Sequence, residues 1–410
     1  MDRQRRPRLA FVSPLFLFPN DAGGKIRTTN ILRGMKGGAF EIVLVGVASP
    51  EQMAQWKTEL DGVCDEFVPW TPAAPRAKWR RALDLLGELP VNVVVDRTPA
   101  GLAAVAGVAA RTNVDVIVFD FVHSAVLLPE PLKAASLCFT HNVEAEIFGR
   151  HAQQAKSSWR RRLWSSQHRK MQRFEGQALN RFDTVIAVSE RDAGQFRSHY
   201  AIRDARAIPT GVDLDFFGWQ APPPVDAAHP PTVVFTGSMD WAANIDGVRW
   251  FLEQVWPLVL AGESNARFTV VGKKPPEALR QLAAQTRHVE FTGFVDDVRP
   301  YAHGAHAFVI PLLVGGGTRI KAFEAMAMGC PVVSTSIGIE GLNAEAEAHY
   351  LNRDDAAGFA AAVLALLREP GLRQRLSGAA RLLVEQRFGH RVAARVFEQI
   401  CLDTLQRRCA

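Results

Sequence analysis

Short runs of β-branched and other apolar residues alternate with longer segments of helical periodicity along the whole 410-residue chain. Apolar runs of this length, separated by helices, are typical of parallel strands that are buried on both faces of a sheet. The pattern occurs twice and predicts an α/β fold with two doubly wound sheets. The predicted strands are Leu9–Ser13, Glu41–Val47, Val114–Phe119, Ser136–Thr140 and Thr184–Val188, then Thr232–Thr236, Phe268–Val271, Val289–Phe291, Ala307–Leu312 and Pro331–Thr335.

The length also favours two domains, because a single hydrophobic core rarely grows this large. Five of the twelve residues from Gln220 to Pro231 are proline, which neither a helix nor a central strand can accommodate. We therefore expect a first domain over 1–219, a linker over 220–231, a second domain over 232–385, and a C-terminal helix over 386–410 that can cross back. Open parallel sheets bind ligands beyond the carboxyl ends of their strands, so two facing domains would form a cleft.

The composition excludes several classes of protein. No apolar stretch reaches the roughly 20 residues that span a bilayer. The basic and then apolar N-terminus lacks a small-residue cleavage site and is interpreted as a first strand that the mature protein keeps. Five scattered cysteines without C-x-x-C spacing suit a reducing cytoplasm.

The segment Lys156–Arg173 holds seven cations and no acid, with Trp159 and Trp164 among them. One interpretation is a solvated basic helix face. The other is peripheral contact with an anionic membrane, here the cytoplasmic face of the inner membrane. No nucleic-acid motif is present, so nucleic acid is not expected as a partner.

The most informative motif lies in the second half. The strand Ala307–Leu312 runs into three glycines ending in Gly316 and Gly317, and Thr318 can cap the helix that follows. Helix N-termini present free N–H groups and a partial positive charge, which suits a phosphate. The alternative is a plain glycine turn that feeds a core helix.

Cations stand in the first turn of this predicted helix. Arg319 and Lys321 oppose the macrodipole by about 0.3–1 kcal/mol each, so an anion should compensate them. A nucleotide diphosphate would do so, and Glu324, one turn deeper, could accept hydrogen bonds from ribose hydroxyls. In the alternative, Glu324 merely pairs with Lys321.

The first half repeats the arrangement. Gly23 and Gly24 follow a strand and are followed by Lys25 and Arg27. A plain turn remains the alternative. His141 directly follows the strand Ser136–Thr140, at an edge that faces the same cleft, although a lone histidine is more often structural. The motifs G-x-G-x-x-G and G-x-x-x-x-G-K-[ST] are absent, which disfavours NAD enzymes and P-loop ATPases.

The sequence resembles the GT-B-fold retaining glycosyltransferases, specifically glycosyltransferase family four, over nearly its whole length. The resemblance rests on GGGTRIKAFEAMAMGCPVVST at 315–335, on FTGFVDDVRPYAHGAHAFVIPL before it, and on AVSERD, IPTGVD and FTGSMDWAANIDGVRWF. It implies two Rossmann-like domains, with the nucleotide-sugar on the second and the acceptor mainly on the first.

The resemblance also implies roles for individual residues. Gly23 and Gly24 would approach the diphosphate, and His141 would lie beside the sugar. Arg319 and Lys321 would hold phosphates, Glu324 would hold the ribose, and Gly237, Gly317 and Thr318 would also belong to the donor site. The backbone around Val295 would meet the base. Gly316 replaces a glutamate usual in the family, and the basic pair usual after Gly237 is missing, so Lys273 is expected to help neutralise the phosphates.

The function so predicted is a metal-independent, retaining hexosyltransferase without a cofactor. It would move a sugar from a nucleotide-diphosphate sugar to a glycan or lipid-linked acceptor, and the GGGTR block resembles enzymes of bacterial exopolysaccharide assembly. Two alternatives remain open. One is a catalytically silent nucleotide-sugar-binding partner of a polysaccharide assembly complex, which the glycine at position 316 permits. The other is a nucleotide-sugar epimerase of similar fold.

Overall fold

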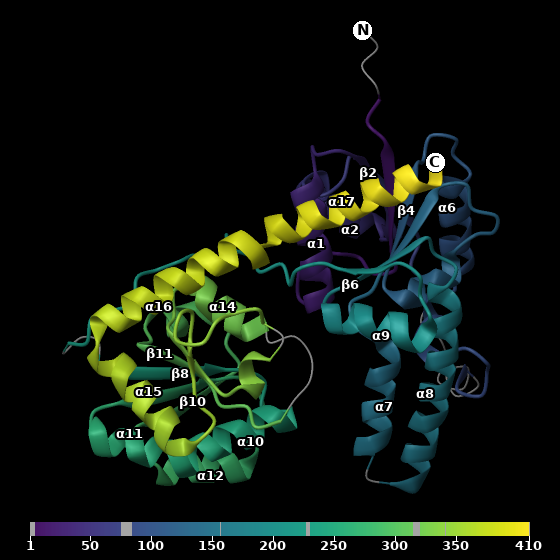
Figure 1. Ribbon diagram of the computed structural model, residues 1–410. Coiled ribbons are helices and arrows are strands. Elements are labelled where there is room, and N and C mark those ends of the chain that lie inside the picture. The colour runs from purple at the N-terminus through teal and green to yellow at the C-terminus, as the bar shows by residue number, and fades with distance from the viewer. Residues whose placement is uncertain are drawn as a thin grey trace. The chain divides into compact units, whose positions relative to one another are not determined.

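The computed structural model describes residues 5–74, 84–155, 157–226, 230–314, 320–340 and 342–409. Its backbone contacts divide the chain into two compact units. Unit 1 comprises Met1–Gly211 and His390–Ala410, and unit 2 comprises Val212–Gly389. In each unit, helices surround a sheet of parallel strands (Figure 1).

Unit 1 contains a seven-stranded sheet of order β3-β2-β1-β4-β5-β6-β7, in which every pair is parallel. The strand order reverses between β1 and β4, the position at which doubly wound sheets place their ligands. The strands are β1 Arg8–Ser13, β2 Glu41–Val47, β3 Glu66–Trp70, β4 Val116–Asp120, β5 Ala135–Phe139, β6 Thr184–Ala187 and β7 Ala205–Ala207.

Unit 2 repeats the same winding with six parallel strands in the order β10-β9-β8-β11-β12-β13. Its reversal point lies between β8 and β11. The strands are β8 Thr232–Thr236, β9 Arg267–Val271, β10 Val289–Gly293, β11 Ala307–Ile310, β12 Val332–Ser334 and β13 Leu351–Asn352. The predicted α/β class with two Rossmann-like domains is confirmed.

Every predicted strand has a counterpart, whereas three observed strands were not predicted. These are β3, β7 and β13, and all of them lie at the edge of a sheet. The strand β3 contains Pro69, which breaks the apolar run, and β7 and β13 are only three and two residues long. Edge strands have one neighbour instead of two, so they need fewer of the apolar residues by which buried strands are found.

The helices cover both faces of each sheet. In unit 1 they are α1 Gly23–Met35, α2 Pro50–Gln55, α3 Lys57–Asp61, α5 Val91–Asp96, α6 Pro99–Ala109, α7 Glu144–Gln154, α8 Ser158–Leu179, α9 Glu190–Tyr200 and α17 His390–Cys409. In unit 2 they are α10 Ala242–Trp250, α11 Trp256–Gly262, α12 Glu277–Gln285, α13 Arg299–His303, α14 Ile320–Met328, α15 Ala356–Arg368 and α16 Pro370–Leu383. No helix among the described residues is long and apolar enough to cross a membrane.

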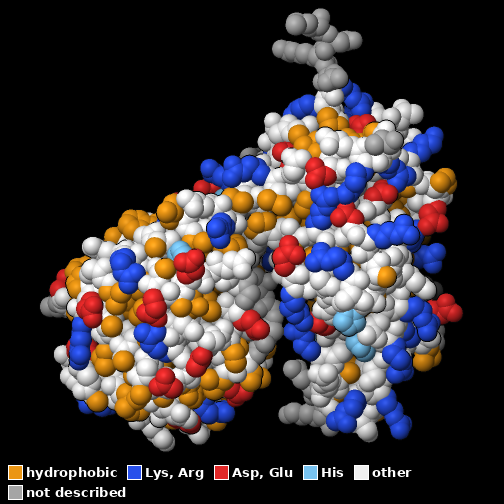
Figure 2. Space-filling view, viewed as in Figure 1, with side chains coloured by type: hydrophobic (Ala, Val, Ile, Leu, Met, Phe, Trp, Pro, Cys, Tyr) orange, Lys and Arg blue, Asp and Glu red, His pale blue; other side chains and the backbone are white. Residues whose placement is uncertain are grey.

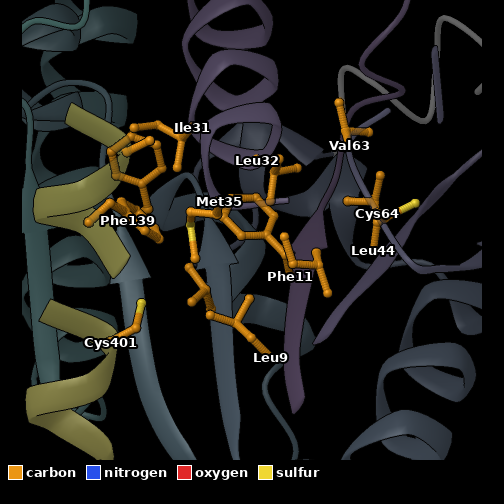
Figure 3. Close-up of a cluster of buried hydrophobic side chains, with 14 of the residues drawn as sticks. Leu9, Phe11, Ile31, Leu32, Met35, Leu44, Val63, Cys64, Phe139 and Cys401 are labelled. Atoms are coloured by element: carbon orange, nitrogen blue, oxygen red, sulfur yellow. The ribbon is translucent and has the colours of Figure 1, made fainter. Parts of the chain in front are cut away.

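The C-terminal helix α17 is part of the core of unit 1. A Cβ atom added to Gly34 of α1 would lie 2.4 Å from Cβ of Ala394, so the two helices approach closely. Phe397 is fully buried, with its ring 5.1 Å from that of Phe139 on β5. Figure 3 shows side chains of β1, α1 and α17, with Cys401 among them, meeting in one apolar cluster.

The unit boundary differs from the predicted one. Unit 2 begins at Val212, eight residues before the proline-rich segment that we expected to be the linker. The described part of that segment is fixed to unit 2: the Gln220 N–H donates to the Met328 carbonyl, and His306 Nε2 lies 3.1 Å from the Pro224 carbonyl oxygen. Proline lacks a backbone donor but keeps its acceptor, so a proline-rich strand can still be held by hydrogen bonds.

Replacing Phe397 by alanine should destabilise unit 1 by about 3–5 kcal/mol, because the substitution leaves a cavity between α17 and the sheet. Urea unfolding of the full chain would measure the change. Gln406→Ala, at an exposed position of the same helix, is the matched control and should change stability by less than about 0.5 kcal/mol. Equal effects of the two substitutions would show that α17 does not belong to the core.

Candidate functional site

The loop after β1 leads into the N-terminus of α1, as the sequence predicts. The helix begins at Gly23, its N-cap residue Ala22 supplies no side-chain hydrogen bond, and no acid occupies the first turn. Lys25 Nζ forms an ion pair with Asp21 Oδ1 at 2.9 Å. The first amides of α1 therefore have no capping side chain and remain suited to an anion.

Gly24 is required by a close approach that the sequence did not reveal. A Cβ atom at this position would lie 2.6 Å from Cζ of Phe121, the residue after β4, and 3.8 Å from Nδ1 of His141. No heavy atom of the described residues lies within 4 Å of the corresponding point at Gly23. The structure thus brings Gly24, Phe121 and His141 together.

His141 follows β5 and is buried. Its Nε2 atom lies 2.7 Å from Oδ1 of Asp120, the last residue of β4. Asp120 is completely buried and also accepts hydrogen bonds from the hydroxyls of Thr28 and Ser13, at 3.0 and 3.1 Å. Asp120 was missed in the sequence, where it directly follows the predicted strand Val114–Phe119.

Burial lowers the pKa of His141, although the charge of Asp120 acts in the opposite direction. The imidazole is therefore neutral at physiological pH, and its Nε2–H donates to Asp120. This tautomer leaves Nδ1 as an acceptor, which Arg27 Nη1 of α1 approaches at 3.4 Å. Arg27 Nε is buried and has no hydrogen-bond partner among the described residues. The pKa of Arg27 is lowered by the same burial.

In unit 2, Lys321 of α14 reaches the carboxyl end of β8. Its Nζ atom lies 3.0 Å from Oδ1 of Asn244 and 4.3 Å from the ring centroid of Phe235. A Cβ atom at Gly237 would lie 2.8 Å from Lys321 Nζ, so only glycine admits the ammonium group here. Asn244 also donates to the Ser238 carbonyl and was not predicted as a site residue.

Glu324 lies one turn further along α14. Burial raises its pKa to about 7, and the nearby charge of Lys321 only partly offsets the shift. No hydrogen bond joins its carboxylate to another described residue. A half-buried carboxylate of this kind can accept hydrogen bonds from ligand hydroxyls.

Two further predicted residues, Lys273 and Val295, follow strands of unit 2. Lys273 is exposed after β9, and its carbonyl accepts a hydrogen bond from the Met239 N–H at 2.9 Å, which places it beside the loop of Gly237. Val295, after β10, packs against the apolar cluster that contains α14. Gly316, Gly317, Thr318 and Arg319 lie outside the described residues.

Two Rossmann-like sheets, each with glycines and a cation at the carboxyl ends of its strands, define an α/β protein of the GT-B type. Residues 58–216 match the family model described as Glycosyltransferase Family 4. Residues 230–369 match the model described as Glycosyl transferases group 1. The first half of the chain is thus similar to glycosyltransferase domains of family 4, and the second half is similar to those of group 1.

Known proteins agree with these domains. The phosphatidyl-myo-inositol mannosyltransferase of Mycobacterium leprae is 31% identical over 198 residues, which are 46% of this chain and 51% of that protein. An uncharacterized 44.6 kDa protein in the cps region of Klebsiella pneumoniae is 27% identical over 120 residues, 28% of this chain and 31% of that one. The chain thus spans about half or less of the length of these relatives.

The fold has solved counterparts over nearly the whole chain. Anabaena Alr3699/HepE, crystallised with UDP, superposes with a TM-score of 0.64 at 12% identity and covers 96% of this chain and 99% of its own. At this identity the likeness shows the fold alone. It confirms the GT-B architecture that the resemblance implied.

Glu324→Gln should abolish one component of the pH dependence of stability. Because the pKa of this acid is raised by folding, the folded state is favoured at low pH and loses stability as the pH rises from about 4.5 to about 7. Thermal melting at pH 5 and pH 8 should show Glu324→Gln gaining up to about 3 kcal/mol relative to the native chain at the higher pH. The exposed control Glu290→Gln should show no such gain. A pH-independent difference would mean that Glu324 is not buried in the unliganded chain.

Proposed function

We propose that the chain is a retaining glycosyltransferase that moves a hexose from a nucleotide-diphosphate sugar to a glycan or lipid-linked acceptor. This proposal rests on four residues near the carboxyl end of β8: Gly237, Asn244, Lys321 and Glu324. They combine a cation with a carboxylate that forms no hydrogen bond with another described residue. This position is where doubly wound sheets bind nucleotides. The UDP bound to the Anabaena structure supports the same class of donor.

In the proposed reaction, the diphosphate leaves while Lys321, together with Arg319, Lys273 and the N-terminus of α14, offsets its charge. Preorganised positive charge of this kind stabilises the leaving group most strongly in the transition state. The acceptor hydroxyl attacks on the face that the diphosphate vacates, which retains the anomeric configuration. No metal is required in this proposal, because protein cations fill the role that a divalent ion plays elsewhere.

Neutral His141 would lie beside the transferred sugar. Its orientation is fixed by Asp120 at 2.7 Å, and its Nδ1 atom remains a hydrogen-bond acceptor. Gly23 and Gly24 at the N-terminus of α1 would approach the diphosphate, with Arg27 near them. We place the reaction in the assembly of bacterial surface polysaccharides, on the cytoplasmic side of the inner membrane.

We further propose that α8 contacts that membrane. Arg160, Arg161 and Arg162 are exposed in its first turns, and Trp159 is 62% exposed. Lys and Arg side chains gather at the free end of the α7–α8 hairpin (Figure 2). Trp164, by contrast, stacks on His151 at 4.8 Å and belongs to the hairpin itself. A basic surface with one exposed indole fits an anionic headgroup layer.

Donor binding can be tested by thermal shift with UDP-, GDP- and TDP-sugars. At 100 times its Kd, the true donor should stabilise the chain by about 2.7 kcal/mol. Lys321→Met should weaken its binding by roughly 10- to 100-fold, because a charged hydrogen-bond donor contributes about 1.5–3 kcal/mol. Lys274→Met, at an exposed site in the adjacent loop, is the control and should bind normally. The absence of a response to every nucleotide would refute the donor site, and NMR that shows an inverted product anomer would refute retention.

Membrane contact can be tested by co-sedimentation with vesicles that contain 30% phosphatidylglycerol. Reversing the charge of Arg160, Arg161 and Arg162 together to glutamate should lower partitioning at least about 100-fold, at about 1 kcal/mol per cation. A control that reverses the exposed Lys133, Arg203 and Arg280 carries the same net charge and should bind like the native chain. Equal loss in both variants would indicate non-specific attraction.

A further inference from the structure

Phe121 has a backbone conformation that bulky residues rarely adopt. Its φ is 64° and its ψ is 141°, directly after the central strand β4. The backbone is fixed on both sides: the Phe121 N–H donates to the Phe139 carbonyl at 2.8 Å, and the Phe121 carbonyl accepts from the Ser124 hydroxyl at 2.8 Å. Such a strained backbone persists only where the surroundings hold it, often at functional sites.

The strained residue places its ring against two histidines. The ring centroid of Phe121 lies 4.1 Å from that of His141 at an interplanar angle of 24°, and 5.1 Å from that of His123 at 26°. Each imidazole has its own carboxylate. Asp120 pairs with Nε2 of His141. Asp96, the last residue of α5, forms a short contact with Nδ1 of His123. Two histidine–aspartate pairs therefore border one phenyl ring beside the reversal point of the sheet.

The two pairs differ in their access to solvent. The side chains of His141 and Asp120 are 2% and 0% exposed, whereas those of His123 and Asp96 are 14% and 13% exposed. His123 Nε2 forms no hydrogen bond with the described residues. Because Nδ1–H donates to Asp96, neutral His123 carries its free lone pair on Nε2, where it can accept a hydrogen bond from a hydroxyl.

The charges around His123 favour its protonated form. Asp96 from α5, Glu144 from α7 and Asp120 from β4 all raise its pKa, and together they outweigh burial. His141 is the positively chargeable group nearby, and its own pKa is lowered. His123 therefore titrates above its ordinary value of 6.5, and its neutral form predominates at pH values above that raised pKa.

We propose that the Asp96–His123 pair binds the attacking hydroxyl of the acceptor and takes up its proton. This inference rests on the proposed glycosyl transfer and adds an acceptor-side residue to it. As the acceptor oxygen bonds to the anomeric carbon, its proton passes to His123 Nε2, and the electrons of the breaking C–O bond leave with the diphosphate. The proton then returns to solvent, to which His123 is open and His141 is closed. The ligand is a sugar or polyol hydroxyl.

The test uses the full chain with the nucleotide-sugar that stabilises it most, and octyl glucoside, octyl galactoside and octyl mannoside as acceptors. His123→Gln should lower transfer by about 10²- to 10⁴-fold, as expected for loss of an acid–base group. The melting shift caused by the donor should remain unchanged. His199→Gln, at an exposed position of α9, is the control and should transfer normally.

The pH profile separates this role from a structural one. Native kcat/KM for the acceptor should fall as the pH drops through the raised pKa of His123. Asp96→Asn removes the charge that raises this pKa, so the fall in kcat/KM should move to lower pH in this variant. In His123→Gln the fall should be absent. Normal transfer by His123→Gln would refute the proposed role of Asp96 and His123, as would an unchanged pH profile of Asp96→Asn. Either result would leave the proposed glycosyl transfer intact. If the native chain released nucleotide from none of the nucleotide-sugars, the proposed glycosyl transfer itself would be refuted, and with it the role of Asp96 and His123.

Discussion

The buried carboxylate of Asp120 organises the unit 1 site. It lies at the end of the central strand β4 with no exposed surface, and a charge in this position must be matched by hydrogen bonds. Three donors supply them: Ser13 at the end of β1, Thr28 on α1, and His141 after β5. One ion thus fixes the relative positions of three neighbouring elements and sets the tautomer of the histidine.

Unit 2 has a comparable arrangement around a cation, the side chain of Lys321. The ammonium group of Lys321 is held between the side-chain amide oxygen of Asn244 and the face of the Phe235 ring, where Gly237 leaves room for it. In both units, a charged side chain is thus placed near the carboxyl end of the central strands by contacts with uncharged side chains. The parallel sheet fixes these strand ends, so the same winding positions both groups although their chemistry differs.

The central strands and the glycine-to-helix junction at Gly23 could be predicted from the sequence, because buried parallel strands are continuous apolar runs and glycine followed by a cation is a local pattern. Edge strands such as β13 could not, since two residues carry no periodic signal. Asp120, Asn244 and Phe121 were missed for another reason. Their roles depend on which strands are neighbours, and that order follows from the winding of the whole sheet. The position of the unit boundary also depends on tertiary contacts, because prolines can be held by their carbonyl groups.

Folding alone does not account for three polar groups near these strand ends. Arg27 Nε, the Glu324 carboxylate and His123 Nε2 lack a hydrogen-bond partner among the described residues, although each side chain is at least partly buried. For the buried Arg27 Nε atom, the missing partner costs about 1–3 kcal/mol. The strained backbone of Phe121 adds to it. Ligand atoms could supply the partners that folding does not: an anion for the guanidinium, and hydroxyls for the carboxylate and the imidazole.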